Sequence, residues 1–363
     1  MDYRENTNHP ELYESLKALP KIELHRHLEG SLRLGTMAQI ASEYKMELPG
    51  YDTAEFRHLV QMTPDDEQTV SAFLSKFNTL RLFYRSREII ERVAYEAVAD
   101  AAADNIIYME LRFTPIALAR REDFSLADVT DWVLAATQRA AQEHKIDVRL
   151  IVNMNRHESV ELGNEMAEIA IERCTDGIVG VDLGGAEHQF SGEPFSPVFR
   201  KARNAGLNIT IHAGEWGGPE RVREAINVLG ATRLGHGVRI IEDSDLVRVA
   251  RDRDIALEVC LTSNWQSGVV PSLAQHPLRD LYQVGLRTTI NTDDPSISAI
   301  NLTDEYVRAM KYLNLSLDDL KQHVLNAAEA SFLTDTEKTA LISRLKVAFD
   351  IKDVAHTPVR PKS

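Results

Sequence analysis

The feature that most constrains the fold of this chain is an eightfold alternation of short apolar runs with amphipathic segments. Segments of helical period separate the runs, among them 125–145, 158–174 and 219–230. Strands that alternate with helices indicate βαβ units and a parallel sheet. Eight such units predict an α/β fold of the closed (β/α)8 TIM-barrel type. The eight expected strands are 21–28, 106–115, 148–155, 177–185, 208–215, 232–237, 256–264 and 287–295.

A doubly wound open sheet is the alternative to a barrel. Such a sheet carries a glycine-rich phosphate-binding turn after its first strand. No GxGxxG sequence follows the run KIELHRHL at 21–28. The barrel is therefore favoured.

The chain of 363 residues is expected to form a single domain, because barrels reach this length once insertions are counted. About 77 residues separate the first expected strand from the second, where a standard unit needs roughly 30. This spacing predicts an insertion at about 31–100, which includes a long helical run at 80–105. Its part just after the first strand is expected to form a lid or pocket wall. Further helices are expected at about 302–350.

Composition narrows the class of partner. Asp and Glu number 55 against 41 Lys and Arg, a net charge of −14 that disfavours nucleic acid and favours a small neutral or zwitterionic molecule. The two cysteines, Cys174 and Cys260, offer neither a disulfide framework nor a CxxC metal site. The polar start MDYREN lacks the pattern of a signal peptide, and no apolar stretch approaches a membrane span. A cytoplasmic protein without a membrane partner is expected.

The residues that carry chemistry stand at the ends of the expected strands, where barrels keep their active sites. His25 and His27 are two apart, so both side chains point to the same side of the first strand. The later strands add the other candidates, which are His212 and Glu215 in HAGE, His236 in GHG, and Asp293 and Asp294 in NTDDP.

Each motif taken singly also has a purely structural interpretation. The HxH pair occurs as hydrogen-bonded core histidines, and His236 fits a hydrogen-bonding residue at a helix start. Glu215 fits the first turn of a helix, and the Asp-Asp-Pro run fits a turn before a helix. All four motifs together, in barrel order, favour a functional site. Three histidines and one carboxylate are typical of a zinc site with water as a further ligand, whereas calcium and magnesium prefer oxygen ligands throughout. Zinc lowers the pKa of bound water from near 16 to roughly 7. The residues thus indicate metal-assisted hydrolysis and leave the substrate class open.

The same motifs resemble the adenosine deaminase family, a branch of the metal-dependent amidohydrolases, and are most similar to the bacterial members. The resemblance rests on ELHRHLEGS (23–31), VDLGGAE (181–187), HAGE (212–215), GHG (235–237), CLTSN (260–264) and NTDDP (291–295), which appear in family order over most of the chain. The fold that it implies is the amidohydrolase barrel. The activity that it implies is hydrolytic deamination of adenosine, and of 2′-deoxyadenosine, to inosine-type products and ammonia, with one Zn²⁺ per subunit.

The resemblance also implies roles for individual residues. The zinc ligands would be His25, His27, His212 and Asp293, with His27 also beside the substrate. Glu215 would donate a proton to the purine ring nitrogen next to the amino-bearing carbon, and His236 would orient or deprotonate the attacking water. Asp294 and the backbone N–H of Gly185 would hold the purine ring.

One residue departs from the family pattern. Nucleoside-specific members usually read HLDG, in which Asp meets a sugar hydroxyl, whereas this chain has Glu29 before Gly30. HLEG is more familiar from relatives that deaminate adenine or an aminofutalosine-type nucleoside, so these substrates stand as the alternative. The substrate-binding residues that the resemblance implies are then His27, Glu29, Gly185 and Asp294.

Two other classes of function compete with the deaminase. A binuclear amidohydrolase usually bridges its metals with a modified Lys at the end of strand four, where this chain has Gly184 and Gly185. A non-catalytic binding module would have lost ligands or proton carriers, and none is lost here. The sequence leaves the roles of His157, Trp216 and Trp265 open, as well as the oligomeric state.

Overall fold

The computed structural model of the protein describes residues 10–48 and 53–351. The polar start MDYREN lies outside these residues. The prediction that residues 1–363 form a single domain stays a prediction.

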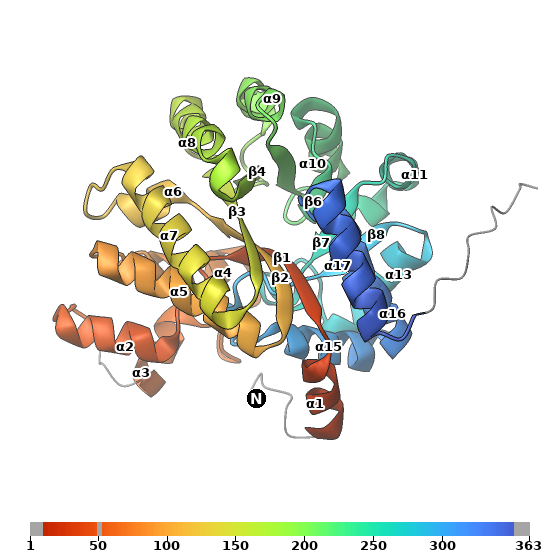
Figure 1. The fold of residues 1–363 in the computed structure, drawn as a ribbon, viewed down its shortest axis with the longest axis horizontal. Coiled ribbons are helices and arrows are strands. Elements are labelled where there is room, and N and C mark those ends of the chain that lie inside the picture. Colours follow the sequence, from red (N-terminus) through yellow and green to blue (C-terminus); the bar gives the residue numbers. More distant parts are fainter. Residues whose placement is uncertain (1–9, 49–52, 352–363) are drawn as a thin grey trace, which may run out of the picture.

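Eight parallel strands form one sheet in the order β1-β2-β3-β4-β5-β6-β7-β8, and helices surround it (Figure 1). This arrangement is the predicted (β/α)8 TIM barrel. The strands are β1 (Lys21–His27), β2 (Ile106–Phe113), β3 (Asp147–Asn155), β4 (Ile178–Gly184), β5 (Asn208–Ala213), β6 (Arg233–His236), β7 (Ala256–Val259) and β8 (Arg287–Ile290).

The helices fall into three groups along the chain. The first group precedes or follows β1: α1 (Pro10–Ala18), α2 (Leu34–Glu43), α3 (Thr53–Val60), α4 (Val70–Leu80) and α5 (Arg87–Ala103). The second group connects the later strands: α6 (Pro115–Ala119), α7 (Leu126–His144), α8 (Val160–Glu172), α9 (Ser196–Asn204), α10 (Pro219–Glu224), α11 (Ser244–Asp252), α12 (Leu261–Gln266) and α13 (Leu278–Gln283). The third group follows β8: α14 (Pro295–Ser298), α15 (Leu302–Leu313), α16 (Leu317–Ala330) and α17 (Asp335–Ala348).

All eight predicted strands are present, but the last two end earlier than predicted. The run at 256–264 is a strand only to Val259, and its CLTSN part begins α12. The run at 287–295 is a strand only to Ile290, so Asp293 lies in the loop that follows β8. Apolar runs alone do not distinguish a buried strand from a short buried helix, which explains both errors.

The predicted helical run at 80–105 is also too long. Helix α5 begins only after Ser86, whose side chain accepts a hydrogen bond from the backbone N–H of Ile89. A serine in this position satisfies one of the free N–H groups at a helix start and marks its boundary. The preceding residues form the end of α4 and a turn.

The barrel closes between β8 and β1 around the residues of the candidate site. The backbone N–H of His27 donates to the carbonyl oxygen of Asp293 (2.8 Å), and the N–H of Asp293 donates to that of His25 (2.9 Å). In the same seam, Asn291 Oδ1 accepts a hydrogen bond from the backbone N–H of Leu24, the residue before His25, at 3.0 Å. The seam that closes the barrel therefore sets the positions of His25, His27 and Asp293 relative to one another.

The insertion after β1 forms α2 to α5, and its contribution to the pocket differs from the prediction. The pocket wall comes mainly from α4, later in the insertion than expected, while α2 lies away from it. The chain before α4 is tied to α14, because Gln61 Nε2 donates to the carbonyl of Ser296 (2.7 Å) and the N–H of Met62 to that of Ile297 (2.8 Å). The wall is thus fixed to the segment that follows Asp294.

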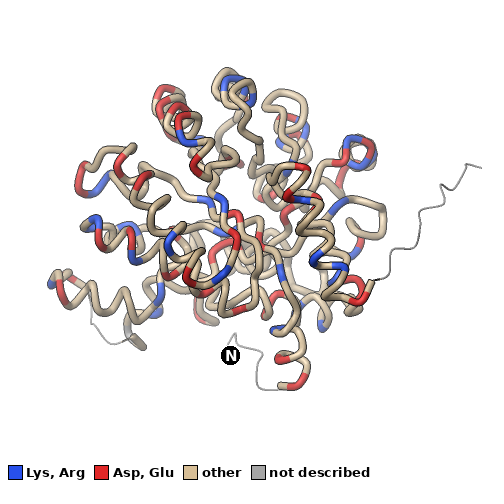
Figure 2. Tube along the Cα trace, viewed as in Figure 1, with Lys and Arg blue, Asp and Glu red and all other residues tan. Residues whose placement is uncertain are grey.

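Acidic and basic residues are interspersed over the surrounding helices (Figure 2). Within residues 10–48 and 53–351, no helix combines the length and the apolar character needed to cross a membrane.

The seam between β8 and β1 can be tested by removing its side-chain acceptor. We predict that Asn291→Ala lowers the free energy of unfolding by about 1–3 kcal/mol, because the buried N–H of Leu24 then has no acceptor. Urea denaturation of the metal-free variant and wild type measures this difference. An unchanged free energy of unfolding would show that the seam does not depend on Asn291.

Candidate metal-binding active site

Four histidines and a carboxylate converge at the carboxyl ends of the strands. His25 and His27 come from β1, His212 from β5, His236 from β6, and Asp293 from the loop after β8. Asp293 Oδ1 lies 3.2 Å from His25 Nε2 and 3.3 Å from His27 Nε2. His27 Nε2 lies 3.2 Å from His212 Nε2. The structure thus brings together residues that are up to 268 positions apart in sequence.

This donor set fits a metal ion. His25 Nε2 is buried and has no hydrogen-bond partner, although it faces the cluster. The ligand atoms of His25, His212, His236 and Asp293 lie within 4.8 Å of one another. Imidazole nitrogens with one carboxylate are ligands that zinc prefers. His27 can take the place of His236 in this set of four ligands, because its Nε2 contacts both Asp293 Oδ1 and His212 Nε2.

Two buried carboxylates hold two of these histidines from behind. Glu258 Oε2 lies 2.8 Å from His25 Nδ1, and Asp182 Oδ2 lies 2.9 Å from His212 Nδ1. A carboxylate that accepts a hydrogen bond from one ring N–H keeps the proton on that nitrogen and leaves the other nitrogen bare for a metal. Burial acts to raise the pKa of both carboxyl groups, but neighbouring positive charge, that of Arg112 in both cases, keeps each pKa below its usual value.

Arg112 joins the two carboxylates across the barrel interior. Its Nη1 donates to Asp182 Oδ2 and its Nη2 to Glu258 Oε2, each at 2.6 Å. Glu258 is also held by Arg233, whereas the described residues give Asp182 only Arg112 and His212 as side-chain partners. All three network residues Arg112, Asp182 and Glu258 are fully buried. A planar fork that binds two carboxylates at once fixes both of them in orientation.

Glu215 and His236 face each other beside the cluster. Their Oε2 and Nε2 atoms are 3.5 Å apart, and both residues are buried. Burial, with the negative charge of Asp293, raises the pKa of Glu215 well above its usual value, and burial lowers the pKa of His236. The raised pKa favours the protonated carboxyl of Glu215, and the lowered pKa favours the neutral imidazole of His236. Such a carboxyl can give a proton to a bound ligand.

The backbone is strained at two residues of the cluster. His236 and Asp293 both have φ of 62°, in the left-handed region that costs non-glycine residues energy. Strained backbone is commonly found at active sites, where surrounding hydrogen bonds hold it.

Glu187 positions the loop that carries Glu215. Its carboxylate accepts the backbone N–H groups of Gly214, Glu215, Trp216 and Gly217 at 2.6, 3.1, 2.9 and 3.0 Å. Sequence reasoning gave no role to Glu187, although its motif VDLGGAE was noted. Only the fold shows that the carboxylate meets four N–H groups of the next strand's loop.

A cavity of about 680 Å³ opens onto the cluster. The remaining predicted substrate residues, Glu29, Gly185 and Asp294, line it. Glu29 Oε1 accepts the backbone N–H of Thr114 at 2.6 Å, while its Oε2 is buried without a partner. Burial raises the pKa of Glu29 to about 6, and burial with the charge of Asp293 raises that of Asp294 well above its usual value.

Asp294 and Gly185 are constrained by their neighbours. A side chain at Gly30 would collide with Asp294, because its Cβ would lie 1.9 Å from Asp294 Oδ1. Gly185 has φ of 85°, a conformation that favours glycine and turns its backbone toward the cavity. Gly30 thus leaves room for the side chain of Asp294, and Gly185 adopts a backbone conformation that would strain a larger residue.

The three residues without an assigned role occupy different places. His157 and Trp216 line the cavity. Trp265 packs, partly buried, against the hydrophobic core and does not line the cavity.

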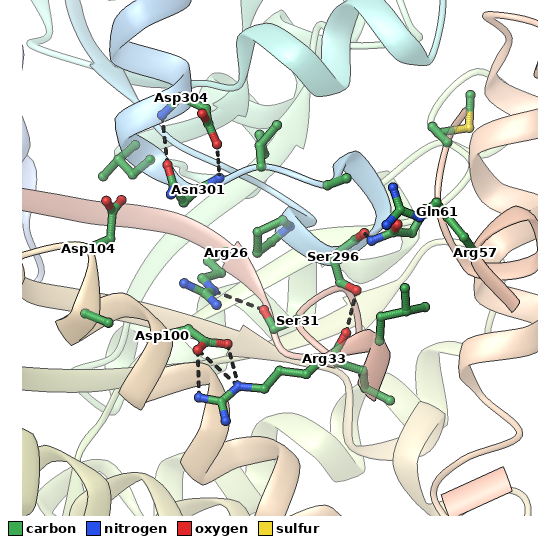
Figure 3. A pocket seen from close by; sticks show the side chains of 18 of the residues that line it. Arg26, Ser31, Arg33, Arg57, Gln61, Asp100, Asp104, Ser296, Asn301 and Asp304 are labelled. Carbon is green, nitrogen blue, oxygen red and sulfur yellow. Dashed lines mark hydrogen bonds and ion pairs between the residues drawn. The ribbon is translucent and has the colours of Figure 1, made fainter. Parts of the chain in front are cut away.

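A larger crevice of about 900 Å³ lies on the outer side of β1 (Figure 3). Ion pairs and caps between its own residues line it, such as Arg33 with Asp100 (2.7 Å) and Asn301 with Asp304. None of the predicted site residues faces this crevice. The smaller cavity is therefore the candidate active site.

Comparisons with known proteins agree on one family. The family model described as "Adenosine deaminase" matches residues 20–348. The chain is 37% identical to an adenosine deaminase of Klebsiella pneumoniae over 329 residues, which are 90% of this chain and 98% of the relative.

Two solved structures share the fold at 26% identity. An adenine deaminase from Arthrobacter aurescens has a TM-score of 0.84, with 92% of this chain and 100% of that chain covered. An Arabidopsis N6-mAMP deaminase has a TM-score of 0.82, with 92% and 99% covered. The named substrates of these relatives differ, although each is built on an adenine ring.

The role of the buried carboxylates can be tested by metal affinity. We predict that Asp182→Ala lowers the affinity for zinc by about 10–100-fold, because His212 loses the group that orients its ring. Competition with a chelator measures the affinity. Glu110→Ala is the matched control, since Glu110 is an equally buried partner of Arg233 that touches no histidine. Equal affinity in Asp182→Ala and Glu110→Ala would contradict the assignment.

Proposed function

The chain belongs to the adenosine deaminase family, and we propose that it deaminates adenosine, and 2′-deoxyadenosine, hydrolytically to inosine-type products and ammonia with one Zn²⁺ per subunit. The observation that carries the proposal is the buried Glu215 beside a metal-binding cluster at the floor of one cavity. The alternative substrates remain adenine and an aminofutalosine-type nucleoside.

The residues proposed to hold zinc are His25, His27, His212 and Asp293. The unpartnered Nε2 of His25 and the carboxylates behind His25 and His212 support this set. When bound, zinc lowers the pKa of a coordinated water to roughly 7 and so supplies a nucleophile at neutral pH.

The protein side chains then handle the ring and its protons. Glu215 donates its proton to the ring nitrogen beside the amino-bearing carbon, which makes that carbon more electrophilic. Burial raises the pKa of Glu215, which favours the protonated form that this step needs. His236, which lies next to Glu215, is proposed to contact the attacking water. When the tetrahedral carbon collapses, its bond to the amino group breaks. The new hydroxyl on that carbon becomes a carbonyl, and its proton passes to the amino group, which leaves as ammonia.

The opposite side of the cavity orients the purine and the sugar. Asp294, whose raised pKa favours a protonated carboxyl, and the N–H of Gly185 are proposed to bind ring nitrogens. Glu29 is proposed to accept a sugar hydroxyl through Oε2, since Oε1 is already bound to Thr114. A buried acceptor without a partner costs free energy, so a ligand that carries a hydroxyl is favoured over free adenine.

We also propose that residues 1–363 act as one domain in the cytoplasm, with a small purine nucleoside as the partner.

The substrate assignment is tested with four compounds. Purified zinc-loaded protein is given adenosine, 2′-deoxyadenosine, adenine and an aminofutalosine analogue, and ultraviolet absorbance and ammonia release are followed. We expect turnover of adenosine and deoxyadenosine. Turnover of adenine alone would exclude the nucleoside assignment. Metal content is measured on the protein before zinc is added. Two metals per chain would favour a binuclear hydrolase, and the absence of both bound metal and turnover would favour a non-catalytic binding module.

The proton-donor role of Glu215 is tested by Glu215→Gln. We predict that this variant keeps zinc but loses kcat by about 10²–10⁴-fold, because an amide of the same shape has no proton to transfer. Metal analysis and steady-state kinetics measure both effects. Glu220→Gln, at an exposed position on α10, is the control and should behave like wild type. Full activity in Glu215→Gln would rule out the role.

A further inference from the structure

The role of His236 depends on which of its two ring nitrogens carries the proton. A neutral imidazole donates from one nitrogen and accepts at the other, and its partners decide which. In this protein the answer follows from a chain of buried hydrogen bonds that begins at a backbone N–H, where the position of the hydrogen is not open to choice.

This series of hydrogen bonds starts at the beginning of α13. The backbone N–H of Leu278 donates to His276 Nδ1 at 3.1 Å. His276 is only 4% exposed, and burial lowers its pKa to about 3, so its ring is neutral. Because Nδ1 accepts, the single ring proton of His276 is on Nε2.

The amide of Asn264 carries this polarity to the active site. His276 Nε2 lies 3.1 Å from Asn264 Oδ1, and Asn264 Nδ2 lies 3.0 Å from His236 Nδ1. The protonated His276 Nε2 donates to Oδ1, which directs the Nδ2 hydrogens toward His236. Turning the amide over would set two donors against each other at His276. His236 Nδ1 is therefore an acceptor.

We infer that Asn264 and His276 are positioning residues that hold His236 in the tautomer with the proton on Nε2, so that His236 donates a hydrogen bond into the active site. The inference deepens the proposed function and rests on it. The Nε2 atom of His236 lies 3.5 Å from Glu215 Oε2 and 3.9 Å from Asp293 Oδ2, at the place proposed for the attacking water.

This tautomer decides between the two possible sets of metal ligands. A protonated nitrogen has no lone pair for a metal, so His236 is not a ligand through Nε2. His25 and His212 are the opposite case, because a carboxylate faces Nδ1 and leaves Nε2 bare. The fourth place therefore goes to His27, whose Nε2 contacts both His212 and Asp293.

The tautomer also decides between the two roles open to His236. Its only free lone pair, on Nδ1, faces Asn264 and not the water. His236 thus orients the attacking water as a hydrogen-bond donor and does not remove its proton.

The inference is tested by NMR of the zinc-loaded protein labelled with ¹⁵N-histidine. Long-range ¹H–¹⁵N correlations show which ring nitrogens are protonated, and the His236 signals are those absent from His236→Gln. We expect His236 to be protonated on Nε2 and bare on Nδ1. A proton on Nδ1 would overturn the inference whether or not the protein turns over adenosine, so the two claims fail separately.

Asn264→Asp tests whether the amide sets the tautomer. A carboxylate accepts only, so His236 must then donate from Nδ1, and the proton is expected to leave Nε2. We expect kcat to fall by about 10-fold or more, with KM within about twofold, because the substrate contacts are untouched. Gln266→Glu is the control, since it makes the same change at an equally buried residue of α12. An unchanged His236 signal in Asn264→Asp would refute the positioning role.

Discussion

The structure depends above all on the way in which β8 meets β1. Two backbone hydrogen bonds link Asp293 to the residues that flank Arg26, and they close a barrel of eight strands. The same bonds set Asp293 Oδ1 within 3.3 Å of the Nε2 atoms of both His25 and His27. The contacts that close the barrel therefore also bring the residues of the metal cluster together. The left-handed conformation of Asp293 is the local cost of this arrangement.

A paired network of buried charges lies inside the barrel. Arg112 and Arg233 alternate with Asp182, Glu258 and Glu110 beneath the histidines. Such a network contributes little net stability, because desolvation offsets much of the attraction, but it leaves each side chain a single low-energy orientation. His25 and His212, which contact Glu258 and Asp182, are therefore held in fixed orientations as well. Binding a divalent ion then needs little rearrangement.

Sequence alone predicted the eight strands and the cluster for a physical reason. His25, His212 and Asp293 are polar residues at the ends of apolar runs, and parallel strands bring such ends to one face. Arg112 and Glu258, each one residue before the end of its strand, gave no such signal, because a buried charge within an apolar run is explained only by partners on other strands. The series of hydrogen bonds from His276 to His236 could not be predicted for a different reason. The CLTSN segment was assigned to a strand, whereas Asn264 lies on α12.

The central claim is that one zinc ion binds between His25, His27, His212 and Asp293 while His236 stays outside its coordination. A crystal structure of the zinc-loaded protein, with anomalous scattering recorded at the zinc edge, tests it most directly. The account predicts one anomalous peak within bonding distance of those four side chains, with His236 Nε2 turned toward a water. Two peaks, or a zinc bonded to His236 Nε2, would contradict it.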